Sequence, residues 1–139
     1  MTRLLISFIF ITILTFSACT LLSVKDGTSS VINIEELIQH WEHSYEEELE
    51  GSDVKVYRPH DYKEFPPSRF RMQYIFEEAD ACQWYYLAPD DGHHFKSGKW
   101  KLDAENSEVL IIEQGEDLIR YRIMELNKEV LRMKFIDTE

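Results

Sequence analysis

The densest group of possible metal ligands in the sequence is a pair of histidines that follows a pair of aspartates. These are His93 and His94, after Asp90 and Asp91. Imidazole and carboxylate groups can hold zinc or nickel. Adjacent residues of a strand point to opposite faces, however, so neighbouring histidines seldom reach one ion. The pattern indicates a solvated hairpin tip, and we expect no metal site.

Motifs that carry catalysis are missing from the sequence. It has no Gly-x-Ser-x-Gly elbow, phosphate-binding Gly-rich loop, His-Glu-x-x-His or Cys-x-x-Cys. Cys82 lies among aromatic residues rather than at a helix N-terminus, where a thiol would be activated. With 26 Asp and Glu residues, any particular acid-base pair would be a chance choice. We therefore expect a protein that is not an enzyme and has no cofactor.

Aromatic side chains that alternate with polar ones are candidates for lining a ligand pocket. They are Phe70, Tyr74, Trp84, Tyr86 and Trp100. Inside a barrel they would either surround an apolar ligand or fill the space themselves. A barrel of about eight strands or fewer is just wide enough to be filled by its own side chains. The sequence favours a filled core, and a ligand pocket is the alternative.

Basic residues flank an apolar residue in four segments. The segments are Arg69-Phe70-Arg71, Lys99-Trp100-Lys101, Arg120-Tyr121-Arg122 and Arg132-Met133-Lys134. With the middle residue inward, the basic side chains are expected to point outward. The last four of them, Arg120, Arg122, Arg132 and Lys134, either pair with acids of the same chain or form a docking face for anions. The many acidic residues favour internal pairing.

Residues 1–18 have the layout of a secretory signal peptide. Arg3 precedes an apolar run at 4–14, which is too short for a transmembrane helix of about 20 residues. Phe16-Ser17-Ala18-Cys19 resembles the lipobox of bacterial lipoproteins. The resemblance implies that Cys19 is lipidated and holds the protein on a membrane of the cell envelope. If Cys19 is left unmodified, a disulfide with Cys82 is the alternative, since these are the two cysteines.

The chain after Cys19 divides into a tether at 19–32 and one folded domain at 33–139. Asn33 and Glu36 form a capping-box pattern, and apolar residues at helical spacing predict a short helix up to Trp41. A first strand with a wet face is expected within 42–50. The segment 54–67 contains three prolines, so we expect an ordered loop with an extended piece at 54–57.

Residues from Pro67 to the C-terminus alternate with period two. They predict strands around 70–76, 82–86, 100–102, 109–112, 119–123 and 131–135. In the last hairpin, a shared inner face for Tyr121, Ile123, Met133 and Phe135 requires odd residues to pair with odd ones. A two-residue Asn127-Lys128 loop would give the wrong parity. We therefore expect a three-residue loop or a bulge.

About seven antiparallel strands after one short helix predict a mainly β fold, in which a meander closes into a small barrel. With Leu37-Ile38-Gln39-His40-Trp41 at its start, this domain resembles the bacterial lipocalin-like domains. The resemblance implies that fold and a habit of binding, with a small apolar ligand or an envelope protein as partner. The alternative is a structural lipoprotein with a filled barrel and no small ligand. The net charge of −11 disfavours nucleic acid.

Overall fold

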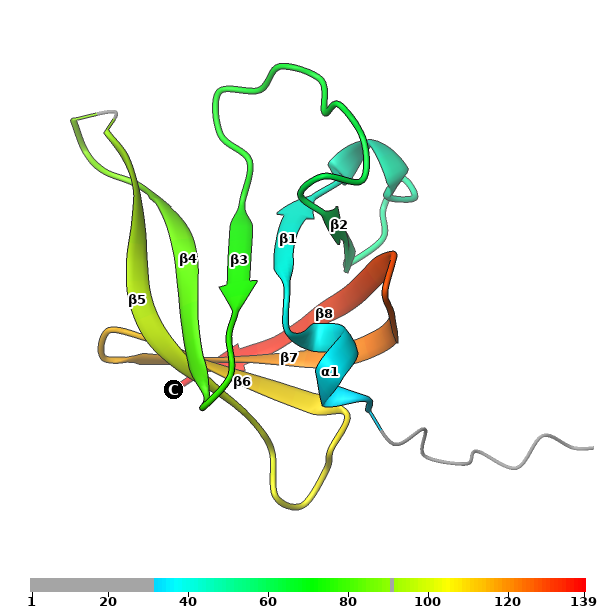
Figure 1. Cartoon of the computed structure of the whole chain (residues 1–139), viewed down its shortest axis with the longest axis vertical. Helices are drawn as coiled ribbons and strands as arrows, with labels where there is room; N and C mark the ends of the chain where they lie inside the picture. Colours follow the sequence, from blue (N-terminus) through cyan, green and yellow to red (C-terminus); the bar gives the residue numbers. More distant parts are fainter. Residues whose placement is uncertain (1–31, 91) are drawn as a thin grey trace, which may run out of the picture.

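The computed structural model describes residues 32–90 and 92–139, which form a closed antiparallel β-barrel (Figure 1). The expected signal peptide, Cys19 and nearly all of the tether lie outside the described residues. The predicted fold class, a mainly β barrel preceded by one short helix, is confirmed.

Eight strands make up the barrel in the described part of the chain. They are β1 (His40–His43), β2 (Val54–Pro59), β3 (Gln73–Phe76), β4 (Ala81–Leu87), β5 (His93–Leu102), β6 (Val109–Gln114), β7 (Asp117–Asn127) and β8 (Val130–Thr138). Around the barrel they follow the order β1-β2-β8-β7-β6-β5-β4-β3, and β3 pairs with β1 to close the ring. The expected meander therefore runs from β3 to β8, whereas β1 is inserted between β2 and β3.

The insertion of β1 forces the chain between β2 and β3 to cross over it. Figure 1 shows this crossing connection, residues 60–72, as a green arch beyond the ends of β1 and β2. Its residues had been expected to belong partly to a strand beginning after Pro67, but β3 begins only at Gln73. The alternating residues 69–72 therefore belong to the crossing connection and not to a strand of the sheet.

Two other elements near the N-terminal side differ from expectation. The helix α1 (Ile34–Leu37) is capped by the side chain of Asn33, as predicted, but it ends before Trp41, which belongs to β1. The acidic segment that was expected to be a strand contains a 3-10 helix, Tyr45–Glu47. Strand β2 extends to Pro59 because a proline at the end of a strand loses no ladder hydrogen bond that the barrel needs.

The barrel interior is filled by the inward side chains of all eight strands. Trp41 and Tyr74 lie directly opposite each other on β1 and β3 and are fully buried. The indole N–H of Trp41 donates to the carbonyl of Leu37 at 2.9 Å, so the polar atom of this large side chain is satisfied. The other core residues are Leu37 from α1 and, from the strands, Tyr57, Phe76, Cys82, Trp84, Trp100, Leu110, Ile112, Ile123, Leu131 and Met133.

The middle of the last hairpin has the register that the sequence predicts, because Tyr121 pairs with Phe135 and Ile123 with Met133. The expected odd-to-odd pairing is wrong at both ends, where Leu131 pairs with Leu126 and Ile119 with Thr138. The shared inner face is also wrong for Phe135, which is 50% exposed. The parity is achieved by a bulge between Ile123 and Glu125, because the loop itself has only two residues between Asn127 and Val130. The bulge alternative is therefore the one that the chain uses.

Gly98 on β5 lies where no side chain fits. A Cβ at this position would lie 2.1 Å from the carbonyl oxygen of Glu113 and 2.7 Å from the ring of Trp84. We expect Gly98→Ala to lower the free energy of unfolding by about 1–3 kcal/mol, since the clash involves backbone and a packed indole. Urea unfolding followed by tryptophan fluorescence measures it. The exposed neighbour provides the control: Ser97→Ala should change stability by less than about 0.5 kcal/mol, and equal effects would contradict the argument.

Candidate binding site on the outer face of the barrel

The aromatic residues that were candidates for lining a pocket mostly form the core. Tyr74, Trp84 and Trp100 are buried in the filled interior. Tyr86 is half-buried under the ammonium group of Lys96, which lies 3.5 Å from its ring centroid. Phe70 was expected on the same inner face, and this is wrong: it lies outside the barrel and stacks on Tyr85. The interior therefore corresponds to the filled alternative, and the hollows worth considering lie outside it.

Arg71 is the most highly connected charged residue of the crossing connection. The sequence pattern predicted that it points outward; it is not in the barrel core, but only 6% of it is exposed. Its guanidinium donates to the carbonyl oxygens of His43 at 2.6 Å and Pro66 at 3.0 Å. It also forms a two-pronged ion pair with Glu46, at 2.6 and 3.0 Å. Arg71 thus joins the crossing connection to the end of β1 and to the 3-10 helix.

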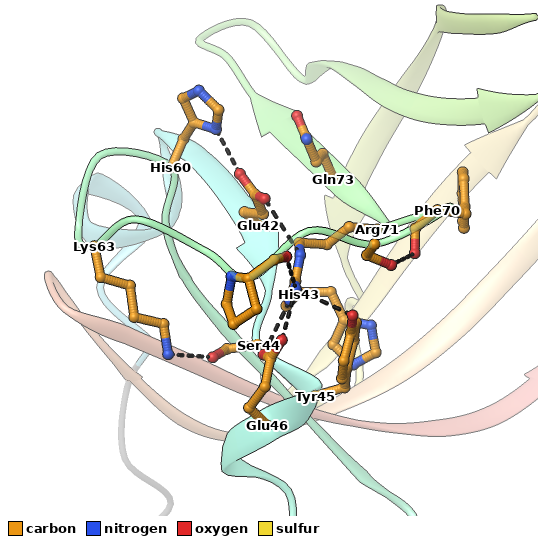
Figure 2. Close-up of polar contacts among 12 residues, drawn as sticks. Glu42, His43, Ser44, Tyr45, Glu46, His60, Lys63, Phe70, Arg71 and Gln73 are labelled. Atoms are coloured by element: carbon orange, nitrogen blue, oxygen red, sulfur yellow. Dashed lines mark hydrogen bonds and ion pairs between the residues drawn. The ribbon is translucent and has the colours of Figure 1, made fainter.

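A second buried charge, Glu42, lies beside Arg71 on β1. Figure 2 shows this carboxylate between His60 and Arg71. One oxygen is 2.6 Å from Nδ1 of His60, and the other is 3.5 Å from Nε of Arg71. Only 7% of Glu42 is exposed, so an unpaired charge there would be costly. The first acid of the segment that had been read as a wet surface is therefore a buried ion-pair member.

The rest of the acidic segment also pairs with cations. Glu47 accepts two hydrogen bonds from Arg58, at 2.6 and 2.9 Å, and one from Lys63. The Arg58 guanidinium is the main cause that lowers the pKa of Glu47 to about 2. Hydrogen bonds from Arg71 likewise lower the pKa of Glu46. The acidic side chains of the 3-10 helix therefore form ion pairs with both β2 and the crossing connection.

A hollow of about 230 Å³, which we call the outer hollow, lies where the crossing connection meets β1, β3, β4 and β5. Its lining includes Glu42, Phe70, Arg71, Gln73, Tyr85 and His93. Charged, amide and aromatic groups thus face one small space, which suits recognition of a polar ligand more than burial of an apolar one.

Aromatic and imidazole rings continue from the outer hollow across the barrel surface. The contacts run from Phe70 to Tyr85 at 5.8 Å, Tyr85 to Phe95 at 5.0 Å, Phe95 to His40 at 5.9 Å and His40 to His60 at 4.3 Å between ring centroids. Phe95 is 39% exposed. We call these five residues the ring row. A row of partly exposed rings is typical of a surface that contacts another molecule.

His40 is a partly buried histidine of the ring row. Burial lowers the pKa of His40, an effect that the hydrogen bond to Gln73 opposes and the neighbouring His60 reinforces. The Nε2 of His40 is 2.8 Å from Oε1 of Gln73. The neutral imidazole is therefore the form that the fold favours.

Sequence reasoning missed the polar residues of this site, because they come from segments that alternation assigned to solvent. Glu42 and Gln73 are directly opposed across β1 and β3, a pairing that depends on the insertion of β1. Arg71 belongs to the segment Arg69-Phe70-Arg71, in which the other basic residue, Arg69, is exposed. The signal that was present is the cluster of prolines at 59, 66 and 67, which indicated an ordered connection.

Three of the four basic residues proposed for anion docking have acidic partners. The ion pairs are Arg120–Glu139 at 3.0 Å, Arg132–Glu125 at 3.1 Å and Lys134–Asp53 at 2.6 Å. Arg122 is directly opposite Lys134, as the register argument implied, and has no ion pair within 32–90 and 92–139. Internal pairing thus neutralises most of this stripe, and anion docking stays a prediction.

The remaining sequence candidates have ordinary surroundings. His93 and His94 are exposed at the start of β5, and the former stacks on Tyr85. In the described part of the chain, no group of three or more His, Cys, Asp or Glu could hold a metal ion. Burial raises the pKa of the Cys82 thiol to about 11, which disfavours the nucleophilic thiolate.

No helix within 32–90 and 92–139 is both long enough and apolar enough to cross a bilayer.

Comparisons with protein-family models, curated proteins and solved structures find no match for this chain.

Removal of the Arg71 charge should loosen the crossing connection. Arg71→Met keeps an unbranched apolar side chain but leaves Glu42 and two carbonyls without their donor, so we expect a loss of about 3 kcal/mol in unfolding free energy. Chemical denaturation measures this loss, and hydrogen exchange should be faster at 60–72. Arg122→Met is the matched control, expected to stay within about 0.5 kcal/mol of wild type. Similar losses in both variants would refute the role of Arg71.

Stability should decrease on mild acidification because of His40. The unfolded chain takes up a proton near the ordinary imidazole pKa of 6.5, whereas folded His40 resists protonation. The free energy of unfolding should therefore fall as the pH drops from about 7.5 to about 5.5. His40→Gln should reduce this slope, and NMR titration of the His40 ring should give a pKa below 6.5. An unchanged slope in His40→Gln would show that other groups cause the effect.

Proposed function

We propose that this chain is a bacterial lipoprotein with a lipocalin-like barrel, anchored by a lipid on Cys19 in the cell envelope. Its barrel is a non-catalytic binding module, and its partner is an envelope component that contacts the outer hollow and the ring row. The lipobox-like Phe16-Ser17-Ala18-Cys19 supports the anchor. Several acyl chains hold a protein on a membrane without a spanning segment, since each buried CH₂ contributes about 0.8 kcal/mol.

The observation that carries the binding role is the contrast between the interior and the outer face. Trp41, Tyr74 and Met133 are fully buried inside the barrel, which supports a filled core rather than a cup for a ligand. On the outer face, in contrast, the charged pair Glu42 and Arg71 borders an open space. Stability alone does not require a buried ion pair beside a hollow, because apolar residues of similar volume often stabilise a fold equally well.

A small apolar ligand remains the second candidate, with a different location. A groove of about 300 Å³ lies between α1, the β3–β4 turn and the end of β5. Its apolar lining, Ile34, Ile38, Trp100 and Leu102, suits an acyl or aromatic group, and Glu78, Asp80 and Lys101 also line it. A purely structural lipoprotein is the remaining alternative, and it predicts that neither surface binds anything.

The proposal can be tested by photo-crosslinking in cells that make the full chain. A photoreactive amino acid replaces Phe95 in the ring row or Leu49, which is 78% exposed on another surface. Labelled fatty acid should enter the wild type but not Cys19→Ala. We expect a discrete adduct from position 95, weaker in Cys19→Ala because the barrel is no longer held at the membrane, and no such adduct from position 49.

Two results would overturn the proposal. Equal fatty-acid labelling of wild type and Cys19→Ala removes the anchor. Equal adducts from positions 95 and 49, or none from either, remove the binding face and favour a structural role.

A further inference from the structure

Two polar atoms bordering the outer hollow have no hydrogen-bond partner within 32–90 and 92–139. The Oε2 of Glu42 bonds to His60, but Oε1 only lies 3.5 Å from Arg71 Nε in an ion pair. In the same way, Gln73 uses Oε1 for His40 and leaves its Nε2 donor unused. Because Glu42 and Gln73 are directly opposed on β1 and β3, the acceptor and the donor belong to neighbouring side chains on one face of the sheet. A ligand with a hydroxyl next to another oxygen satisfies both.

The charges of Glu42 and Arg71 at the outer hollow are already paired within the protein, so they need no ionic ligand. Glu42 forms ion pairs with His60 and Arg71, and Arg71 also pairs with Glu46. An apolar side chain would leave Glu42 Oε1 desolvated without a donor, which costs free energy. A neutral ligand rich in hydroxyl groups avoids this cost and adds no unpaired charge.

The aromatic lining and the size narrow the ligand further. The rings of Phe70 and Tyr85 stack on each other, at an interplanar angle of 8°, and both line the hollow together with the polar groups. The volume of about 230 Å³ is below the roughly 300 Å³ at which drug-sized pockets begin. A single six-membered ring, with C–H groups on its faces and hydroxyls around its rim, fits this combination.

We propose that the outer hollow binds a neutral sugar ring of an envelope glycan. This inference depends on the binding role proposed above and names the chemical group that the partner presents. The sugar ring packs against the aromatic pair of Phe70 and Tyr85, one hydroxyl donates to Glu42 Oε1, and a neighbouring oxygen accepts from Gln73 Nε2. Arg71 acts indirectly, because it holds the crossing connection that forms one wall.

Saturation-transfer NMR on the full-length protein tests this proposal. The protein is kept in a detergent whose head group contains no sugar. The probes are the neutral methyl glycosides of glucose, galactose, mannose and N-acetylglucosamine, with methyl glucuronide and methyl glucosaminide as charged versions of the glucose ring. We expect at least one neutral glycoside to bind saturably in the millimolar range, as a ligand of this size does. Both charged probes should bind about tenfold or more weakly than methyl glucoside.

Variants locate the binding. Tyr85→Ala and Gln73→Ala should each weaken the neutral probe about tenfold or more, whereas Tyr85→Phe should bind like the wild type. Tyr62→Ala is the control, since Tyr62 is an exposed tyrosine of the same crossing connection that packs on Arg58 away from the hollow. Tryptophan fluorescence shows whether each variant is folded.

The inference is overturned if no neutral glycoside binds saturably, if the charged probes bind as well, or if Tyr62→Ala is as harmful as Tyr85→Ala. Its failure is distinguishable from failure of the binding role. A discrete protein adduct from position 95 without sugar binding keeps the binding role and assigns it a protein partner.

Discussion

The buried guanidinium of Arg71 is the interaction on which the architecture of this barrel depends. The ring of strands closes only because β1 lies between β2 and β3, and that order sends residues 60–72 across the end of β1. A connection of this length has a large conformational entropy to lose. Arg71 fixes it at Pro66, at His43 and at Glu46, and it accepts burial because each of these oxygens receives one of its N–H groups.

Closure with a filled interior has a consequence for function. When Trp41, Tyr74 and their neighbours occupy the inside, a barrel of this size has no deep cup, and recognition must use its outer face. The outer surface of a barrel is convex, so a hollow requires an added wall. The crossing connection supplies that wall, and the same residues that solve the problem of topology therefore create the candidate site.

The sequence predicted the part of the fold that local alternation determines. Strands from β3 onward, their inward aromatic residues and the odd-to-odd pairing of Ile123 with Met133 all follow from period-two patterns. The insertion of β1 could not be predicted in this way, because its pairing with both β2 and β3 is non-local. The burial of Glu42, expected in a strand with a wet face, and of Arg71, expected to point outward, was missed for the same reason: only the three-dimensional contact between distant segments shows that each charge has a partner.

The ion pairs of the outer surface also depend on contacts between segments that are distant in the sequence. Arg122 and Lys134 are directly opposed on β7 and β8, an arrangement that destabilises a sheet unless a third group neutralises it. Asp53, from the turn before β2, lies 2.6 Å from Lys134 and provides that neutralisation. Exposed pairs contribute only about 0–1 kcal/mol each, so this stripe adds little to stability. The chain concentrates its buried, well-bonded charges at the crossing connection instead, where loss of a partner would open the barrel wall and the outer hollow together.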